Sequence, residues 1–228
     1  MDEARKLLEQ LMFLYAPWEV VSVSCQAGGE DHSPGRVTVE LAMKKGQLVP
    51  CPHCGAMCKR HDEKQREWRD LDLLGWRTVV RAAVPRANCP RHGVHQVEVP
   101  WAESRSRQTM RLESAVIEDL LEMNLHAVSR KWGLGWHQVD GIRARAVRRG
   151  LRRRGPQRPK RIGIDETSFQ KRHEYVSIVV DQEQARRRRG SGVLYVADRK
   201  DRAAVEPFFR GLGEDACARI AQACADLV

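Results

Sequence analysis

Long apolar runs are missing from this 228-residue sequence, and so is a secretory leader. No apolar stretch approaches the roughly 20 residues that a helix needs to cross a bilayer. The opening MDEARKLLEQ lacks the basic start and the apolar core of a signal peptide. These absences argue against a membrane partner and predict a cytoplasmic protein. No internal repeat is visible, which argues against a solenoid.

Acidic residues are in the minority. The chain has 40 Lys and Arg against 30 Asp and Glu, a formal net charge of +10, while 42% of its residues are hydrophobic. That composition is typical of a folded protein with a buried core. The excess of positive charge favours a polyanionic partner, because lysine and arginine on phosphates release condensed counterions. Nucleic acid is the first expectation, and a merely well-solvated basic surface is the alternative.

The first segment, residues 1–48, is expected to form a helix and a β-hairpin. Apolar residues recur at near-helical spacing between residues 3 and 15. Two strand-like runs, WEVVSVSC and RVTVELAM, flank a turn rich in glycine and proline.

The seven cysteines are an odd number, which suits metal ligands and buried thiols in a reducing compartment better than disulfides. CPHCG supplies Cys51 and Cys54, and NCPRHG supplies Cys89 and His92, with 34 residues between the two pairs. This is the spacing of a zinc ribbon, here residues 49–100, in which four ligands surround a structural Zn²⁺. The alternatives are unrelated buried thiols, or replacement of one ligand by another nearby side chain: Cys58, His53, His61 or His95.

Residues 105–151 are expected to form three helices, the last two joined by the turn GLGW as in a helix-turn-helix. The final helix would then offer His137, Gln138, Asp140, Arg143 and Arg145 to base edges in the major groove. An ordinary helical hairpin is the alternative.

Charge favours DNA over that alternative. From Arg143 to Arg161 there are ten basic residues and no acid, a run suited to a phosphate backbone. Its end, residues 152–161, has the composition of a linker. The further residues expected to touch DNA are Arg148, Arg149, Arg152, Arg153 and Arg154.

The last segment, residues 162–228, contains three short strands, a helical stretch and a fourth strand near the end. A ribonuclease-H-like domain begins in this way. Carboxylates on its first and fourth strands hold Mg²⁺ for phosphoryl transfer, and Asp165 and Asp226 occupy those places. Asp181 and Asp198 are interpreted as turn residues. The fold class expected for the whole chain is α+β multidomain.

The combination of CPHCG, a helix-turn-helix, a basic linker, IGIDE and YVADRKD resembles the ISL3 family of bacterial insertion-sequence transposases of the DDE class. The resemblance covers nearly the whole chain. It implies a protein that binds double-stranded DNA at the terminal inverted repeats of its element. Cutting and joining would use two aspartates, at Asp165 and Asp226, and a glutamate. Assembly of several copies on the DNA is a further expectation.

The family's catalytic glutamate comes from a helix beyond the second aspartate, whereas this sequence stops at Val228. Glu166 is a poor replacement, because neighbouring residues on a strand point to opposite faces. The sequence therefore predicts a truncated, catalytically incomplete transposase. The alternatives are a DNA-binding regulator derived from such an enzyme, and an RNA-binding zinc-ribbon protein, which the recognition-helix pattern disfavours.

Overall fold

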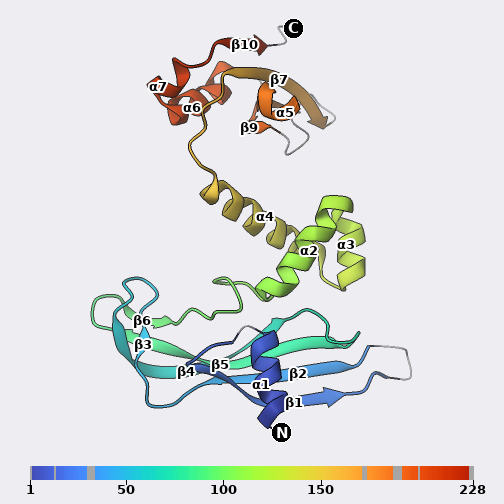
Figure 1. Cartoon of the computed structure of the whole chain (residues 1–228), viewed down its shortest axis with the longest axis vertical. Helices are drawn as coiled ribbons and strands as arrows, with labels where there is room; N and C mark the ends of the chain where they lie inside the picture. The colour runs from blue at the N-terminus through green and yellow to red at the C-terminus, as the bar shows by residue number, and fades with distance from the viewer. Residues whose placement is uncertain are drawn as a thin grey trace. The chain divides into compact units, whose positions relative to one another are not determined.

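The computed structural model describes residues 2–12, 14–29, 34–170, 174–186, 192–199 and 201–225. The chain forms two compact units, residues 1–147 and residues 148–228 (Figure 1). None of the helices in these described ranges is long and apolar enough to cross a membrane.

The first unit is built on a mixed β-sheet of six strands. Helix α1 (Asp2–Leu11) comes before the sheet, whose strands lie in the order β1-β2-β5-β4-β3, with β6 paired to β5. The strands are β1 (Trp18–Gln26), β2 (Arg36–Met43), β3 (Val49–Pro50), β4 (Met57–Arg69), β5 (Arg77–Cys89) and β6 (Gly93–Gln96).

Strand β2 pairs with β5 in parallel, from Arg36 opposite Arg77 to Ala42 opposite Ala83. This pairing differs from the expectation of a separate N-terminal segment and zinc ribbon, because it unites the two in one sheet. The reason lies in β2, where Val37, Val39 and Leu41 are all buried. A two-stranded hairpin would leave that apolar side uncovered.

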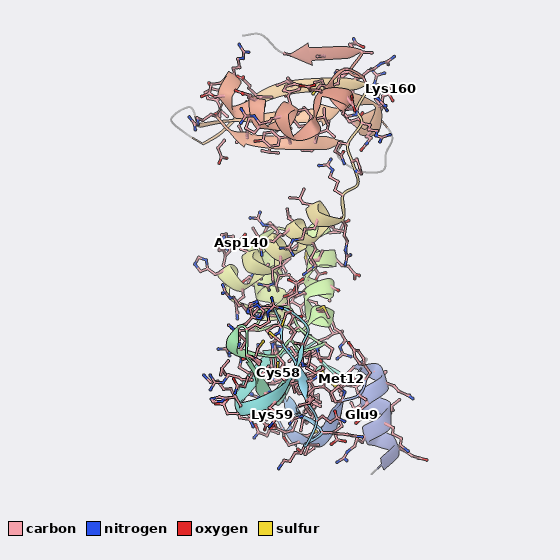
Figure 2. The ribbon with its side chains drawn as sticks, turned by 90° about the vertical axis from the view of Figure 1, so that its left-hand side faces the viewer. Glu9, Met12, Cys58, Lys59, Asp140 and Lys160 are labelled. Atoms are coloured by element: carbon pink, nitrogen blue, oxygen red, sulfur yellow. The ribbon has the colours of Figure 1, made fainter. Side chains whose placement is uncertain are left out.

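One core runs through this unit and reaches both predicted segments. It includes Met12 beside α1, strand residues from β1 to β5, and Trp101 in the loop after β6. Trp101 meets Trp18 and Trp68 edge to face, with ring centroids 4.8 and 5.4 Å away. Figure 2 shows the core residues Met12 and Cys58 within this unit.

Three helices complete the first unit, as the apolar spacing predicts, and the last of them extends into the second. They are α2 (Met110–Glu122), α3 (Leu125–Trp132) and α4 (Trp136–Arg153). Their interior is a separate cluster of fully buried aliphatic side chains: Leu112, Val116, Val128, Val139 and Ile142. Thr109 and Asn124 cap α2 and α3 by accepting main-chain N–H groups.

Helix α4 includes the first two residues of the segment predicted to be a linker. Helical structure continues to Arg153, because 143–153 contains no proline and the first one follows at Pro156.

The second unit has a four-stranded sheet in the order β10-β7-β8-β9. Strands β7, β8 and β9 are antiparallel neighbours, and β10 returns parallel to β7. Phe208 of α6 packs with Ile162, Val179 and Leu194 of the sheet. The elements are β7 (Arg161–Gln170), β8 (Glu174–Asp181), α5 (Gln182–Arg186), β9 (Val193–Asp198), α6 (Arg202–Leu212), α7 (Glu214–Cys217) and β10 (Gln222–Ala225).

Candidate functional site

The four predicted zinc ligands converge at the β5–β6 end of the first sheet. The donor atoms of Cys51, Cys54, Cys89 and His92 all lie within 4.8 Å of one another. His92 Nδ1 is 3.6 Å from Cys51 Sγ and 3.5 Å from Cys89 Sγ, and the Sγ atoms of Cys54 and Cys89 are 3.9 Å apart. In a tetrahedron with Zn–S of about 2.3 Å and Zn–N of about 2.0 Å, the edges are about 3.5 Å for S–N and about 3.8 Å for S–S. The donor set therefore fits Zn²⁺.

Local hydrogen bonds shape the two tight turns that carry the ligand pairs. Gly55 donates to Cys51 O at 2.8 Å, and Cys51 donates to Ala56 O at 2.9 Å, so the chain turns tightly around the first pair. Gly55 and Gly93 have φ values of +70° and +80°, which glycine adopts without steric cost.

The same turns prepare thiols for a metal. The main-chain N–H of Arg91 lowers the pKa of Cys89, burial opposes it, and the N–H of His92 assists, with a resulting pKa of about 7. Burial raises the pKa of Cys51, but the N–H groups of His53 and Cys54 outweigh it, and the net shift is downward. Thiolates are the species that bind zinc.

The alternative ligands lie outside this group in the described part of the chain. Cys58 is buried in the sheet core and its Sγ donates to Ala56 O at 3.2 Å. His95 Nε2 lies 2.6 Å from His92 O, and its ring stacks edge to face on His53. His61 is exposed on β4.

The second predicted site is the helix-turn-helix, α3 and α4. Gly133 ends α3 in the left-handed conformation, with φ of 59° and ψ of 35°, and Leu134 donates to Ser129 O at 3.1 Å. At the start of α4, His137 is exposed. Gln138 is exposed as well, but its Oε1 accepts the Gly135 N–H at 2.7 Å and so caps the helix.

The arginines of α4 differ in their surroundings. Arg143 forms a surface pair at 2.7 Å with Asp140 of the same helix; Figure 2 labels Asp140. Arg145 instead donates from Nε and Nη2 to Glu113 of α2, at 2.9 and 2.6 Å. Arg148 is exposed one turn further along the helix.

The end of the basic run is also mixed. Arg152 and Arg153 are exposed, Arg149 is partly buried, and Arg154 turns toward strand β9. The arginine-rich sequence alone could not show which of these side chains bond to other parts of the protein and which are exposed to solvent.

The predicted catalytic pair is only partly within the described residues. Asp165 lies exposed on β7, and its Oδ1 accepts the N–H of Glu166 at 2.8 Å. Glu166 and Ile164 line a cavity of about 430 Å³ against α6, so Asp165 belongs to the opposite face of the strand. Asp226 lies outside the described residues.

Asp181 caps α5 by accepting the N–H groups of Glu183 and Gln184 at 2.9 and 3.1 Å, in keeping with a turn role. Asp198 ends β9 and is exposed.

Sequence reasoning missed two fully buried carboxylates, Asp70 and Glu113. Glu113 follows the helix cap Thr109 by four residues and is part of the acidic first turn of α2, which explains it as a helix-start signal without revealing its partner. Asp70 gave no signal.

Three family models match successive parts of the chain. They are a zinc finger of the transposases IS204, IS1001, IS1096 and IS1165 over residues 47–92, the helix-turn-helix domain of transposase family ISL3 over 97–147, and a transposase domain of the same family over 162–228. The zinc finger match contains all four clustered ligands and ends on the last of them, His92.

The curated relatives that the chain matches are also insertion-sequence transposases. The transposase for insertion sequence element IS1557 of Mycobacterium tuberculosis is 32% identical over 199 residues, which cover 84% of this chain and 42% of the relative. The transposase for IS1001 of Bordetella parapertussis is 29% identical over 225 residues, covering 98% and 52%.

The chain thus spans about half the length of the curated relatives it matches. No solved structure gives a significant match. Because matches to the zinc finger, the helix-turn-helix and the transposase domain follow one another along the sequence, the chain belongs to the ISL3 family of insertion-sequence transposases.

Proposed function

We propose that this chain binds double-stranded DNA at the terminal inverted repeats of an insertion sequence and acts in DNA transposition. The observation that carries the proposal is the geometry of α3 and α4. A left-handed glycine turn joins the two helices, and the start of α4 presents exposed polar side chains. In a helix-turn-helix the second helix enters the major groove with its N-terminal residues on base edges.

His137 is the main base-reading residue in this proposal, because it is exposed at the start of α4. Gln138 contributes with its amide nitrogen, since its oxygen is used in capping. Arg143, Arg148, Arg149, Arg152 and Arg153 contact phosphates.

The Cys/His cluster has a structural role in this proposal. We propose that Zn²⁺ is held by Cys51, Cys54, Cys89 and His92 in a closed structural site. Support comes from the close grouping of the donors, three of whose separations match the edges of a zinc tetrahedron, and from the zinc finger match. Four protein ligands leave no open position for a substrate.

The second unit is proposed to be the start of a ribonuclease-H-like domain, because three antiparallel strands are followed by helices and a strand parallel to the first. The register brings Ala225 of β10 opposite Ile164 of β7. Asp226 and Asp165 each follow those residues directly in the sequence. Mg²⁺ is the proposed cofactor here, with one ligand, Asp165, among the described residues.

The test of DNA recognition compares a duplex carrying a terminal repeat with a scrambled duplex of equal length, by fluorescence anisotropy at several salt concentrations. We expect tighter binding to the repeat. His137→Ala should reduce the preference, and Arg148→Ala should weaken binding to both duplexes alike. Equal affinity of the unmodified chain for both duplexes would overturn the proposal. Mass photometry of the complex reports how many copies assemble.

Metal binding in the second unit has a separate test. Mn²⁺ can replace Mg²⁺ and broadens the NMR signals of nearby nuclei. Broadening centred on β7 that disappears in Asp165→Asn supports the site, and broadening unchanged by the substitution contradicts it.

A further inference from the structure

The first turn of α2 is attached on both sides through buried charges. Thr109, its cap, and Arg111 contact Asp70, the residue that directly follows strand β4. Glu113, two residues beyond Arg111, contacts Arg145 of α4. Both carboxylates are 0% exposed.

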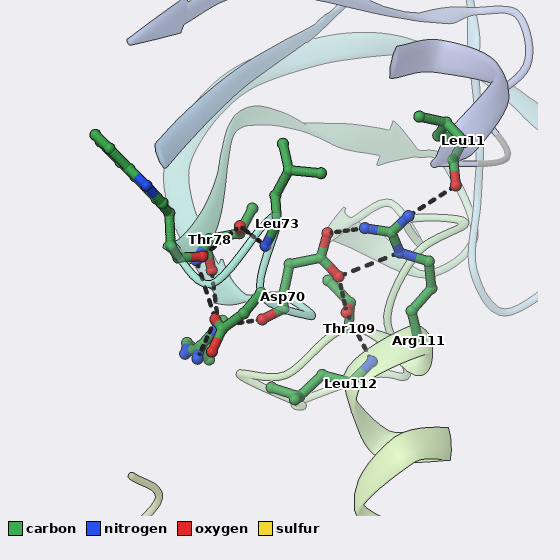
Figure 3. Close-up of polar contacts among 10 residues, drawn as sticks. Leu11, Asp70, Leu73, Thr78, Thr109, Arg111 and Leu112 are labelled. Atoms are coloured by element: carbon green, nitrogen blue, oxygen red, sulfur yellow. Dashed lines mark hydrogen bonds and ion pairs between the residues drawn. The ribbon is translucent and has the colours of Figure 1, made fainter. Parts of the chain in front are cut away.

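Figure 3 shows the contact on the sheet side. Asp70 Oδ1 accepts from Thr109 Oγ1 at 2.5 Å, and Asp70 Oδ2 accepts from Arg111 Nη2 at 2.6 Å. Arg111 Nη1 continues to Leu11 O, at the end of α1, at 2.7 Å. Thr109 Oγ1 also accepts the N–H of Leu112 at 3.3 Å. One carboxylate therefore joins α1, the sheet and the start of α2.

The contact on the recognition-helix side is equally specific. Glu113 Oε1 accepts from Ser106 Oγ at 2.9 Å and from Nε and Nη2 of Arg145 at 2.9 and 2.6 Å. Arg145 Nη2 also approaches Gln108 Oε1 at 3.5 Å. Ser106 Oγ in turn accepts the N–H of Gln108 at 3.0 Å, which fixes the loop that leads into α2.

Removing Arg145 from this arrangement would take the two guanidinium N–H donors away from the buried carboxylate of Glu113. A buried carboxylate deprived of its partner costs more free energy than an exposed arginine–phosphate contact returns. Arg145 is therefore unsuited to move onto a DNA phosphate.

The turn between α3 and α4 also lies close to the sheet. Nη2 of Arg77, at the start of β5, lies so close to Gly133 that a Cβ there would be 2.5 Å away. Leu71, in the connection between β4 and β5, also packs against the helical core. The helix-turn-helix is thus fixed to the zinc-bearing sheet at several points.

We propose that Glu113 and Arg145 are positioning residues for DNA recognition. They form a clamp that fixes α4 on α2, while Asp70 with Thr109 and Arg111 fixes α2 on the sheet. Arg145 acts inside the protein and contributes no phosphate contact. This inference rests on the proposed binding of terminal repeats.

The first experiment separates a clamp from a phosphate contact by salt dependence. Each arginine that neutralises a phosphate contributes about 0.9 to the slope of log affinity against log salt. We expect the slope of Glu113→Gln to stay the same when Arg145→Gln is added. Arg148→Gln, on an exposed neighbour, should reduce it by about 0.9. A loss of that size on adding Arg145→Gln would overturn the proposal.

The second experiment measures specificity. Glu113→Gln should lower the ratio of affinities for repeat and scrambled duplexes about tenfold, whereas a smaller folded fraction would lower both affinities equally and leave the ratio unchanged. Glu118→Gln makes the same chemical change on the exposed side of α2 and should leave the ratio as it was. An unchanged ratio in Glu113→Gln would count against the clamp.

Two further measurements keep the test decisive. Arg145→Lys keeps the positive charge but loses the paired Nε and Nη2 contact with Glu113. If Arg145 is part of a clamp, the ratio of affinities for repeat and scrambled duplexes should fall while the slope of log affinity against log salt stays the same. If Arg145 instead contacts a phosphate, both the ratio and the slope should be kept. Hydrogen exchange without DNA should show faster exchange of the α4 amides in Glu113→Gln than in Glu118→Gln. If the unmodified chain does not prefer the repeat, the proposed function fails, and equal exchange in the two variants would separately refute the clamp.

Discussion

The guanidinium of Arg154 donates to two main-chain oxygens of strand β9, Val193 O at 2.6 Å and Leu194 O at 3.1 Å. Arg152 and Arg153 are exposed, and no ion pair is found for either among the described residues. Three consecutive arginines, alike in sequence, therefore differ in what they can offer to a nucleic acid. One is anchored within the second unit and two are available.

This difference predicts the salt dependence of DNA binding. Replacing Arg152 and Arg153 together by glutamine should flatten the slope of log affinity against log salt by up to about two, because each can neutralise one phosphate. Arg154→Gln should leave the slope unchanged and lower the thermal stability of the second unit. Anisotropy titrations from 50 to 200 mM salt, roughly the range over which such contacts are lost, measure the slopes. A slope that responds to Arg154→Gln alone would contradict the assignment.

Removal of zinc should disrupt the whole first sheet, since Cys51 and Cys89 belong to its common core. Cys51→Ser or a strong chelator is expected to abolish the cooperative unfolding transition of this unit, as structural zinc supplies on the order of 10 kcal/mol. Metal analysis should find one Zn²⁺ per chain. Cys25→Ser, at an exposed cysteine, is the matched control and should keep both zinc and stability. Full zinc retention in Cys51→Ser would point to a different ligand set.

Gly133→Ala should destabilise the helix-turn-helix. The position has φ of +59°, and an added Cβ would lie 2.5 Å from Arg77 Nη2. Left-handed backbone costs a residue with a Cβ about 1 kcal/mol, and the exposed guanidinium of Arg77 can move aside at little further cost. Chemical denaturation measures the change. Gly150→Ala, on the same pair of helices with open space around it, should be neutral or stabilising. Equal effects of the two substitutions would refute the assigned turn.

The packing of α3 on α2 should depend on pH. The ammonium of Lys131 lowers the pKa of Asp119, burial opposes it, and the Trp132 N–H assists. A carboxyl whose pKa is lower in the folded state stabilises the fold above its unfolded pKa, and loses that contribution as pH falls through the folded pKa. The melting-temperature difference between the unmodified chain and Asp119→Asn should therefore be full at neutral pH and shrink below about pH 4. A constant difference from pH 7 to pH 3 would contradict this.

Much of this fold could be predicted because its signals are local. The ligand spacing of Cys51, Cys54, Cys89 and His92 fixes two tight turns, and the three helices of the binding module follow from apolar residues three and four apart. Strand β10 was harder, since its alanine-rich sequence also suits a helix. The structure gives a short helix at Glu214–Cys217 before the strand.

What the sequence could not reveal is non-local. The parallel pairing of β2 with β5 joins residues far apart in the chain, and no turn residue announces it. Arg145 is bound by Glu113, and Arg154 is bound by two carbonyl oxygens of β9. A count of charges along the sequence reveals neither contact. Burial of Asp70 follows from packing alone.

The parallel pairing of β2 with β5 also bears on how the chain can be shortened. A protein beginning at the first zinc knuckle would lack β1 and β2, and the 13-residue strand β5 would then present an open edge. Buried valines and alanines of that strand would face water beside unpaired main-chain groups. Long, apolar, open edges recruit strands from other molecules. We therefore expect the N-terminal hairpin to protect the zinc ribbon against self-association, so that a soluble DNA-binding fragment should retain it.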